Sequence, residues 1–404
     1  MISFNGCKTA SPIYAIIGLA AIICVTTIQA ELRQVNVVFR HGDRTPDIDN
    51  EGYPNDPYLN FSYAPMGRGQ LTNQGKRREY QLGKIMLERY GGFIGNTYTP
   101  KSVSGLSSDY DRTKMSLQLV LASLFPPSKQ QRWNYHLNWQ PIPARYLLRI
   151  EDNIFLADEC PLYLAEYDRV LRSPQGKSGI SNYKDFMRQL TEWTGKNIST
   201  PLDMYYIYHT LMAEYSFGLT LPEWAYKIFP YGELWNATVF SYDIASSTPL
   251  LRRLYAGPYL LRVTRTMLDF VTGTSENERL MYLYSGHETN IAAVLHALQV
   301  YKPHVPEYSS AVFMELHEID SQYYVKVAHY LGIPSKVEEV QLPNCDLLCP
   351  LDKYLQLTEE LMPSKEELVC DKGLTKKYAD EKSPEELDLT RYNLIRTARA
   401  YKTE

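Results

Sequence analysis

The sequence has no large excess of charge of either sign, no internal repeat and no low-complexity tract. Its 42 Lys and Arg residues stand against 46 Asp and Glu, so that the 404-residue chain carries a net charge of −4. This balance provides no general positive field for nucleic acid or anionic lipid, and any recognition of anions must therefore be local. A composition that is 44% hydrophobic and 22% charged is typical of a folded globular protein. We expect no nucleic-acid partner.

Cysteine is scarce as well. The chain has 6 Cys, and neither a CxxC pair nor a nearby histidine pattern of the kind that binds zinc accompanies them. Cys7 and Cys24 lie in the first thirty residues. The four others are Cys160, Cys345, Cys349 and Cys370. In an oxidising compartment this even number predicts two disulfides, for which three connectivities are possible.

Long apolar runs are missing except near the N-terminus. Lys8 supplies a positive start, residues 13–25 form an apolar core, and Ala30 is a suitable cleavage position. The core is short for a bilayer span, although an uncleaved membrane anchor is the alternative. We predict that residues 1–30 are a signal peptide and that the mature protein is secreted, extracellular and without a membrane anchor. Three Asn-X-Ser/Thr acceptors suit this route, at Asn60, Asn197 and Asn236.

Three places in the chain share one layout of apolar strand, polar turn and apolar helix. They are the strand 35–39 with the turn after it, the extended segment 98–108 with a helix over 111–125, and the strand 280–284 with a helix over 291–298. This layout is the repeating unit of a parallel α/β sheet. Ligands of such sheets bind beyond the carboxyl ends of the strands. Cationic or titratable side chains stand at these ends in all three places: Arg40, His41 and Arg44, then Arg112, then His287.

The fold class predicted from these patterns is α/β, with a mostly parallel sheet, helices on both faces and a smaller, mainly helical inserted lobe. Residues 31–135 and 246–375 are assigned to the α/β catalytic domain, which includes an antiparallel hairpin over 311–331 at the sheet edge. Residues 136–245 are rich in Tyr, Trp and isolated Pro and are assigned to the lobe, with helices over 182–195 and 203–218. Residues 376–404 are expected to form a charged C-terminal tail.

Residues 40–46, Arg-His-Gly-Asp-Arg-Thr-Pro, resemble the signature of the histidine acid phosphatases, a branch of the phosphoglycerate-mutase-like superfamily. Two further segments match elements of that family: 108-SDYDRTKMS-116 resembles its second arginine element, and 285-SGHE-288 resembles its late histidine-acid element. The resemblance runs from about residue 34 to about residue 372. The sequence GDRTP and the late segment CDLLCP are most similar to those of animal acid phosphatases, in particular the venom acid phosphatases of insects.

The chemistry of these residue types agrees with the roles that the resemblance implies. A phosphomonoester needs a nucleophile for phosphorus, positive charge on its oxygens and an acid for the leaving group. His41 would attack as a neutral imidazole, because neighbouring guanidinium groups lower its pKa, and would form a phosphohistidine. Arg40, Arg44 and Arg112 would hold the phosphoryl oxygens, with imidazolium His287 as a further donor. Since these side chains supply the charge, we expect neither metal nor cofactor.

The proton donor is the point at which the sequence departs from the family. Animal acid phosphatases usually place aspartate after the late histidine, whereas this chain has Glu288, which is one methylene longer. Glu288 is the expected acid because reach matters before pKa, and Asp43 and Asp111 are the alternatives. We otherwise expect Asp111 to orient Arg112 or to cap its helix, and Asp43 to be solvated. The histidines outside the motifs, His209 among them, are assigned to packing or to the surface.

The resemblance also implies the disulfides Cys160–Cys370 and Cys345–Cys349. The sequence as a whole predicts a secreted acid phosphatase, a phosphoric monoester hydrolase that acts on small phosphate monoesters. The alternatives are a phytase-like inositol phosphate phosphatase, or a secreted binding protein of the same fold without turnover. A homodimer is compatible with the high tyrosine content of 33 residues.

Overall fold

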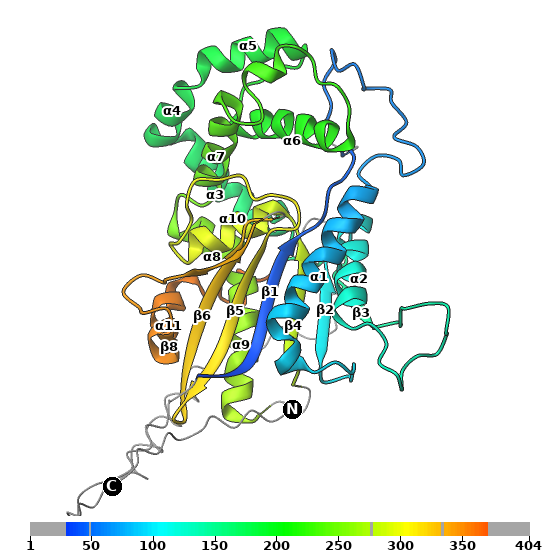
Figure 1. Ribbon diagram of the computed structural model, residues 1–404. Coiled ribbons are helices and arrows are strands. Elements are labelled where there is room, and N and C mark those ends of the chain that lie inside the picture. The colour runs from blue at the N-terminus through cyan, green and yellow to red at the C-terminus, as the bar shows by residue number, and fades with distance from the viewer. Residues whose placement is uncertain (1–29, 48–49, 275–277, 333–334, 371–404) are drawn as a thin grey trace, which may run out of the picture.

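The computed structural model describes residues 30–47, 50–274, 278–332 and 335–370 (Figure 1). Its centre is a sheet with the strand order β3-β2-β4-β1-β5-β6-β7, to which β8 is added by pairing with β6. The parallel strands are β1 (Glu31–Arg40), β2 (Val103–Ser107), β3 (Ala144–Tyr146) and β4 (Met281–Gly286). The antiparallel strands are β5 (Ala311–Ile319), β6 (Gln322–Tyr330), β7 (Val337–Val340) and β8 (Cys349–Pro350). The predicted α/β class with a mainly parallel central sheet is confirmed.

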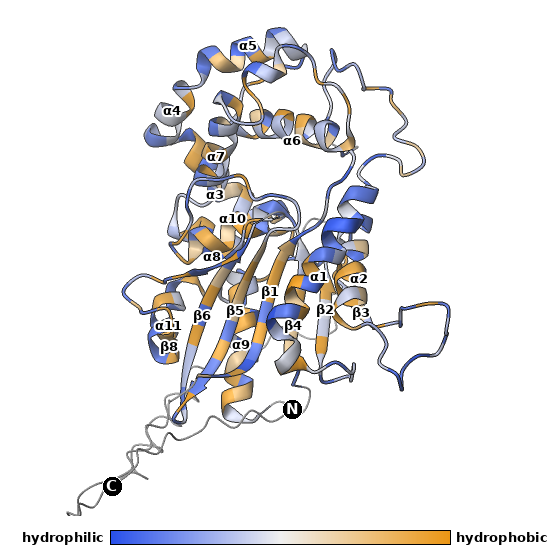
Figure 2. Ribbon diagram, in the orientation of Figure 1, coloured by the Kyte–Doolittle hydropathy of each residue, from blue (hydrophilic) through white to orange (hydrophobic). Residues whose placement is uncertain are grey.

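Helices cover both faces of the sheet because the strands are apolar on both sides (Figure 2). On one face, Val35, Val37 and Phe39 of β1 share a core with α1 (Asn73–Ile94) and α2 (Asp111–Leu124). On the other face, Val38 belongs to a core that includes α8 (Pro249–Tyr255), α9 (Gly257–Thr272), α10 (Glu288–Ala297) and α11 (Leu351–Thr358). Residues of two lobe helices also contribute to this core, Tyr163 and Val170 of α3 (Pro161–Arg172) and Ile244 of α7 (Glu233–Ala245).

Helix α1 is absent from the predicted elements although it has 22 residues. Its first turns are strongly charged, and the apolar residues that face the sheet, such as Leu82, Met86 and Tyr90, come only later. Thr72 caps the helix, because its Oγ1 accepts a hydrogen bond of 3.0 Å from the Gly75 amide. A threonine at the N-cap position is a sequence signal for the start of a helix.

The lobe lies beyond the carboxyl ends of the parallel strands (Figure 1). Its helices are α3 (Pro161–Arg172), α4 (Pro174–Ser181), α5 (Lys184–Thr194), α6 (Pro201–Phe217) and α7 (Glu233–Ala245). Side chains of α5, α6 and α7 form a core of their own, to which Tyr53 from the segment after β1 also contributes. The short 3-10 helices are Ala157–Glu159, Ala225–Lys227 and Glu359–Leu361. Strand β3 falls inside the range predicted for the lobe, yet it pairs with β2 and belongs to the sheet.

The register of the parallel strands determines where the site forms. Strand β4 lies between β1 and β2, with Arg40 opposite Gly286 and Ser107 opposite Ser285. The carboxyl ends of three strands therefore meet at one edge. The predicted hairpin is β5–β6, but β7 lies outside β6, so the hairpin is not itself the edge of the sheet.

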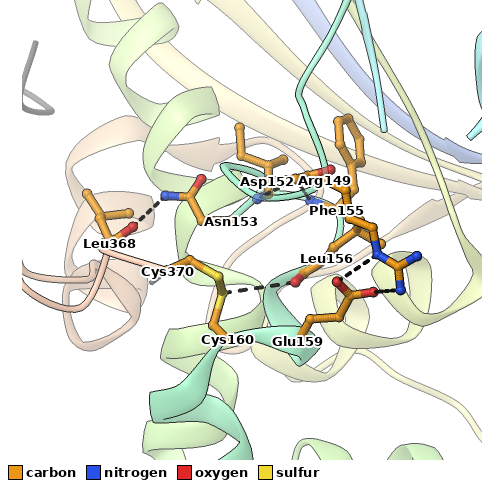
Figure 3. Close-up of a disulfide and its surroundings, with 10 residues drawn as sticks. Arg149, Asp152, Asn153, Phe155, Leu156, Glu159, Cys160, Leu368 and Cys370 are labelled. Atoms are coloured by element: carbon orange, nitrogen blue, oxygen red, sulfur yellow. Dashed lines mark hydrogen bonds and ion pairs between the residues drawn. A yellow bond between two sulfur atoms is a disulfide. The ribbon is translucent and has the colours of Figure 1, made fainter. Parts of the chain in front are cut away.

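Two disulfides join the cysteines in the pairing that the resemblance implies, Cys160–Cys370 and Cys345–Cys349. Figure 3 shows the first, which fastens the start of α3 to the C-terminal segment. Beside it, Asn153 Nδ2 donates a hydrogen bond of 2.8 Å to the Leu368 carbonyl. Together these contacts hold the loop that enters the lobe.

The two ends of the chain and the glycosylation acceptors are the subject of further predictions. The predicted signal peptide and the charged tail lie outside the described residues, apart from Ala30. In the described ranges, no helix has the length and hydropathy needed to cross a membrane. All three glycosylation acceptors, Asn60, Asn197 and Asn236, are exposed.

Candidate active site

A cavity of about 420 Å³ opens at the carboxyl ends of the parallel strands. From the sheet edge its walls contain His41, Arg44, Arg112, His287 and Glu288. From the lobe its walls contain, among others, Tyr163, Tyr167, Tyr205, Tyr206 and Tyr242. Arg40 lies next to this cavity, with its Nε 3.0 Å from Glu288 Oε2. The six predicted site residues are thus brought together from three separate segments of the chain.

His41 follows β1 and is 1% exposed. Its Nδ1 lies 2.8 Å from the Gly42 carbonyl, which can only accept, so the ring proton is on Nδ1. The Nε2 lone pair faces Arg112, whose Nε donates to it at 3.2 Å. Burial, followed by the guanidinium groups of Arg112 and Arg40, holds the pKa of His41 well below its usual value. Burial and the guanidinium groups both favour the neutral imidazole that was predicted, and burial has the larger effect.

The loop after β1 is pressed against the first turn of α1. A Cβ at Gly42 would lie 2.5 Å from the Gly75 carbonyl oxygen, and a Cβ at Gly75 would lie 2.2 Å from the Asp43 carbonyl oxygen. No side chain fits at such distances, so both positions require glycine. The expected close backbone approach at Gly42 is therefore present, and it fixes His41 from behind.

Each of the predicted arginines has a carboxylate partner. Arg44 binds Glu51 in a bidentate pair of 2.5 and 2.6 Å, and Arg112 Nη1 lies 3.0 Å from Asp47 Oδ2. Such pairs orient the planar fork of a guanidinium before any ligand arrives. Burial opposes the charge of Arg44, but Glu51 outweighs it and raises the pKa well above the usual value. Sequence reasoning missed Asp47 and Glu51, although both stand in an acidic run directly after the motif.

Three buried guanidinium nitrogens of the predicted arginines have no hydrogen-bond partner among the described residues, namely Arg40 Nε, Arg40 Nη2 and Arg44 Nε. Arg40 Nε forms an ion pair with Glu288 and Arg40 Nη1 donates to the Pro306 carbonyl, which leaves Arg40 Nη2 and Arg44 Nε as donors without a contact of either kind. A buried donor without a partner is costly and is rare in native proteins. An anion with several oxygens, such as a phosphate group, would satisfy both donors.

His287 precedes α10 and lies beside His41, with ring centroids 5.6 Å apart. Its Nε2 is 3.0 Å from Ser108 Oγ, at the end of β2. Burial and then Arg112 lower the pKa of His287 to about 3. The expected imidazolium is thus not favoured, because burial, and after it the nearby guanidinium groups, disfavour a positive charge on this ring.

Glu288 is 5% exposed and is held from two sides. Its Oε2 faces Arg40, and its Oε1 accepts a short hydrogen bond from the Tyr205 hydroxyl. Burial acts to raise the pKa of Glu288, but Arg40, with smaller contributions that include the Tyr205 hydrogen bond, holds it well below the usual value. The candidate proton donor is therefore a carboxylate in the ligand-free protein.

The two alternative acids are placed elsewhere. Asp43 is 1% exposed rather than solvated, and its Oδ2 lies 3.1 Å from Arg78 Nε. It lines a second cavity of about 270 Å³ instead of the one at His41. Asp111 is exposed, and Gln70 Nε2 donates to it at 3.4 Å. The expectation that it orients Arg112 or caps α2 is wrong, because Asp47 binds Arg112 and Tyr110 occupies the N-cap position without a side-chain hydrogen bond.

The lobe contributes residues that the sequence analysis assigned to no site. Tyr205 and His209 lie one turn apart on α6, and Tyr242 comes from α7. Only their spacing on a helix could have suggested a shared face, and nothing in the sequence indicates that this face meets Glu288. In the described part of the chain, no group of three or more His, Cys, Asp or Glu side chains is arranged to hold a metal ion.

Comparison with known proteins gives a consistent result. The profile of the histidine phosphatase superfamily (branch 2) matches residues 31–329. The venom acid phosphatase Acph-1 of Apis mellifera is 60% identical over 380 residues, which cover 94% of this chain and 98% of that protein. Lysosomal acid phosphatase of Homo sapiens is 31% identical over 379 residues, which cover 91% and 86% of the two chains. The phytase of Citrobacter braakii shares the fold, with a TM-score of 0.64 at 17% identity over 84% of this chain and 99% of that one.

Proposed function

This chain belongs to branch 2 of the histidine phosphatase superfamily, and we propose that it is a secreted acid phosphatase that hydrolyses small phosphate monoesters. The observation that carries the proposal is the unprotonated Nε2 of His41, which lines a cavity shared with Arg44 and Arg112. The similarity to the Apis mellifera protein, a venom acid phosphatase, supports both the activity and the export.

The proposed reaction has two displacements at phosphorus. His41 Nε2 attacks, the bond from phosphorus to the ester oxygen breaks, and the leaving oxygen takes a proton from Glu288. Arg40, Arg44 and Arg112 hold the other phosphoryl oxygens, whose charge they offset through charge-assisted hydrogen bonds. Water then attacks the phosphohistidine and gives up a proton to Glu288, which releases phosphate and restores neutral His41. No step requires a metal.

Glu288 must gain its proton when the substrate binds. A phosphate group beside Arg40 adds negative charge near the carboxylate and offsets the guanidinium that keeps the pKa of Glu288 low. The pKa of Glu288 therefore rises in the complex, and protonation is favoured as the pH falls. We expect activity to peak at acidic pH for this reason.

A leaving-group experiment tests the role of Glu288. Glu288→Gln should slow the hydrolysis of alkyl phosphates by about 10²–10⁴-fold, and p-nitrophenyl phosphate much less, because nitrophenolate leaves without a proton. Equal losses on the two substrates would remove Glu288 from the role of acid.

A trapping experiment separates the enzyme from a non-catalytic binding protein of the same fold. Enzyme quenched with alkali during turnover of labelled substrate should carry phosphate that is stable to alkali and labile to acid. His41→Asn should carry none. Purified protein that hydrolyses no monoester and never becomes labelled would favour the binding protein.

The charge of the cavity argues against a phytase-like substrate. Among the described residues of its lining, Arg149 is the one further arginine beyond Arg44 and Arg112, no lysine is present, and five carboxylates line the same walls. These carboxylates are Asp47, Glu51, Asp158, Glu159 and Glu288. A substrate with six phosphate groups would be repelled where one phosphate would not. Inositol hexakisphosphate should therefore be hydrolysed far more slowly than a simple monoester.

Two finer features of the mature protein belong to the same proposal. We propose that Asn60, Asn197 and Asn236 carry glycans, which digestion with an endoglycosidase would reveal as a loss of mass. We also propose a homodimer that uses the aromatic surface next to β3, where Tyr135 is 88% exposed and Trp133 is 59% exposed. Light scattering on wild type and on Tyr135→Asp tests this, since only the variant should be monomeric.

A further inference from the structure

The carboxyl group of Glu288 is contacted by both the sheet domain and the lobe. Arg40, at the end of β1, contacts Oε2 with its Nε at 3.0 Å. The Tyr205 hydroxyl donates to Oε1 from α6, a helix of the lobe that lies 83 residues earlier in the chain. The two oxygens are thus held by two different parts of the fold.

Tyr205 is itself fixed by buried neighbours. Its ring centroid lies 4.3 Å from that of His209, one turn further along α6. His209 Nε2 lies 3.2 Å from the Tyr242 hydroxyl of α7, and His209 is 0% exposed. Burial lowers the pKa of His209 to about 3, so this ring is neutral and adds no competing charge. The Tyr205 hydroxyl therefore has little freedom to leave Glu288.

The contact depends on the length of the side chain at position 288. Aspartate would place the carboxyl group one carbon–carbon bond closer to the backbone, about 1.5 Å. Such a group could not contact both Arg40 and Tyr205 where they stand. The length of glutamate is thus what allows both contacts to be made together.

We propose that Tyr205 is a positioning residue that determines which oxygen of Glu288 carries the catalytic proton. Both oxygens have a donor in the structure, Tyr205 on Oε1 and Arg40 on Oε2. When Arg40 turns to the phosphate, the tyrosine still occupies Oε1, and Oε2 becomes the free site of protonation. Oε2 is the oxygen that faces Arg40, which in the proposed reaction is drawn to the phosphate. The proton is then on the oxygen next to the substrate, from which it passes to the leaving oxygen. This inference rests on the proposed function.

The surroundings of Glu288 are consistent with this role. The charged and titratable groups that interact with it are Arg40, His41, Tyr205, His209, Tyr242, Tyr255 and His287. The three histidines are shifted toward their neutral forms, and burial raises the pKa of each tyrosine. Among these groups, Arg40 carries the positive charge next to Glu288. Tyr205 is the one whose hydroxyl donates a hydrogen bond to the carboxylate.

The test compares Tyr205→Phe with Tyr215→Phe, the same change on the same helix at an exposed position outside the cavity. We expect Tyr205→Phe to lower kcat for an alkyl phosphate about tenfold to hundredfold, with KM nearly unchanged. With p-nitrophenyl phosphate kcat should change less than about threefold, because that leaving group needs no acid. Tyr215→Phe should resemble wild type, and equal losses on the two substrates would overturn the proposal.

A double-mutant cycle shows whether Tyr205 acts through Glu288. In a Glu288→Gln background, Tyr205→Phe should cause no further loss on the alkyl phosphate. The same loss in both backgrounds would overturn the proposal. Failure of the acid assignment looks different, because Glu288→Gln would then show no dependence on the leaving group. If Tyr205→Phe folds poorly, Tyr205→Leu replaces it, since leucine also lacks the hydroxyl donor and should show the same selective loss.

Discussion

The two walls of the active-site cavity consist of different kinds of side chain. The sheet edge contributes arginines and histidines, and these are fixed by carboxylates and by backbone carbonyls, as Arg44 is by Glu51 and His41 by Gly42. The lobe contributes tyrosines, whose rings pack together and whose hydroxyls bond locally, as Tyr163 does to the Ala245 carbonyl. The charge needed for phosphoryl transfer thus comes from one wall, and shape with directed hydroxyl groups from the other.

The difference indicates how the two walls should respond to substitution. Changes at the sheet edge remove charge or the nucleophile and should affect the chemical step. Changes in the lobe should affect how the alcohol part of the substrate binds, apart from Tyr205, which contacts the acid. Substitutions on each wall can test this division.

The largest effect should come from the nucleophile. His41→Asn should lower kcat for p-nitrophenyl phosphate by about 10⁴-fold or more, since no other group can form the covalent intermediate. Steady-state kinetics measures the loss, and a thermal melt that stays near wild type shows that the fold is intact. Residual activity above a few per cent of wild type would assign the nucleophile to another residue.

A smaller loss of activity is expected when Arg44 is replaced by lysine, which keeps the positive charge but lacks the planar pair of N–H donors. Arg44→Lys should lower kcat/KM about 10²-fold, because an ammonium group cannot bind Glu51 in a bidentate pair and also donate to phosphate. The exposed Arg145→Lys on β3 is the matched control and should leave kcat/KM unchanged. If Arg44→Lys matched this control, the fork would not be needed.

Substitutions in the lobe wall should change KM more than kcat. Tyr167 lines the cavity and stacks on Tyr163 with ring centroids 6.1 Å apart. Tyr167→Ala should raise KM for an aryl phosphate about threefold to tenfold while kcat stays close to wild type. Tyr231→Ala, at a position that is 83% exposed, serves as the control. A large fall in kcat would break the proposed division between the walls.

The most subtle effect concerns protons. Glu288 is ionised in the ligand-free protein because its pKa lies well below the usual value, and a bound dianion should raise this pKa. Binding then takes up a proton, so the affinity for sulfate, which does not titrate near neutral pH, should rise as the pH falls. Each proton taken up contributes about tenfold in affinity per pH unit, between the free and bound pKa values. Calorimetry at several pH values should show a shallower dependence for Glu288→Gln, and equal slopes would contradict proton uptake by Glu288.

Sequence patterns predicted the sheet edge well because its functional residues are contiguous. Residues 40–46 follow a strand that is apolar on both faces, and this arrangement fixes both the position and the exposure of the loop. The buried face of α2 is harder to read from the sequence: the apolar Met115, Leu119 and Ala122 fall on one helical face, but they are only partly buried. The buried face contains serines, and a Cβ on Gly83 of α1 would meet Ser123 Oγ at 2.0 Å. Hydropathy counts those serines as polar although close helix packing requires small residues there.

The remaining site residues could not be found from sequence because they depend on long-range contacts. Asp47 and Glu51 become partners of arginines only through the path of the loop after β1. Tyr205 contacts Glu288 only because the lobe closes over the sheet edge. Local propensity and hydrophobic periodicity carry no information on either arrangement. The resemblance to a family gave the motif residues but not these supporting ones.

The strand order has a consequence for synthesis. Strands β1 and β2 are made early, yet they do not pair with each other, because β4 fills the position between them. Until residue 286 has left the ribosome, the edges of β1 and β2 that pair with β4 have no partner for their backbone groups, although β2 can pair with β3. Newly made chains should therefore depend on chaperones for much of translation, and the Cys160–Cys370 disulfide cannot form until Cys370 has been made.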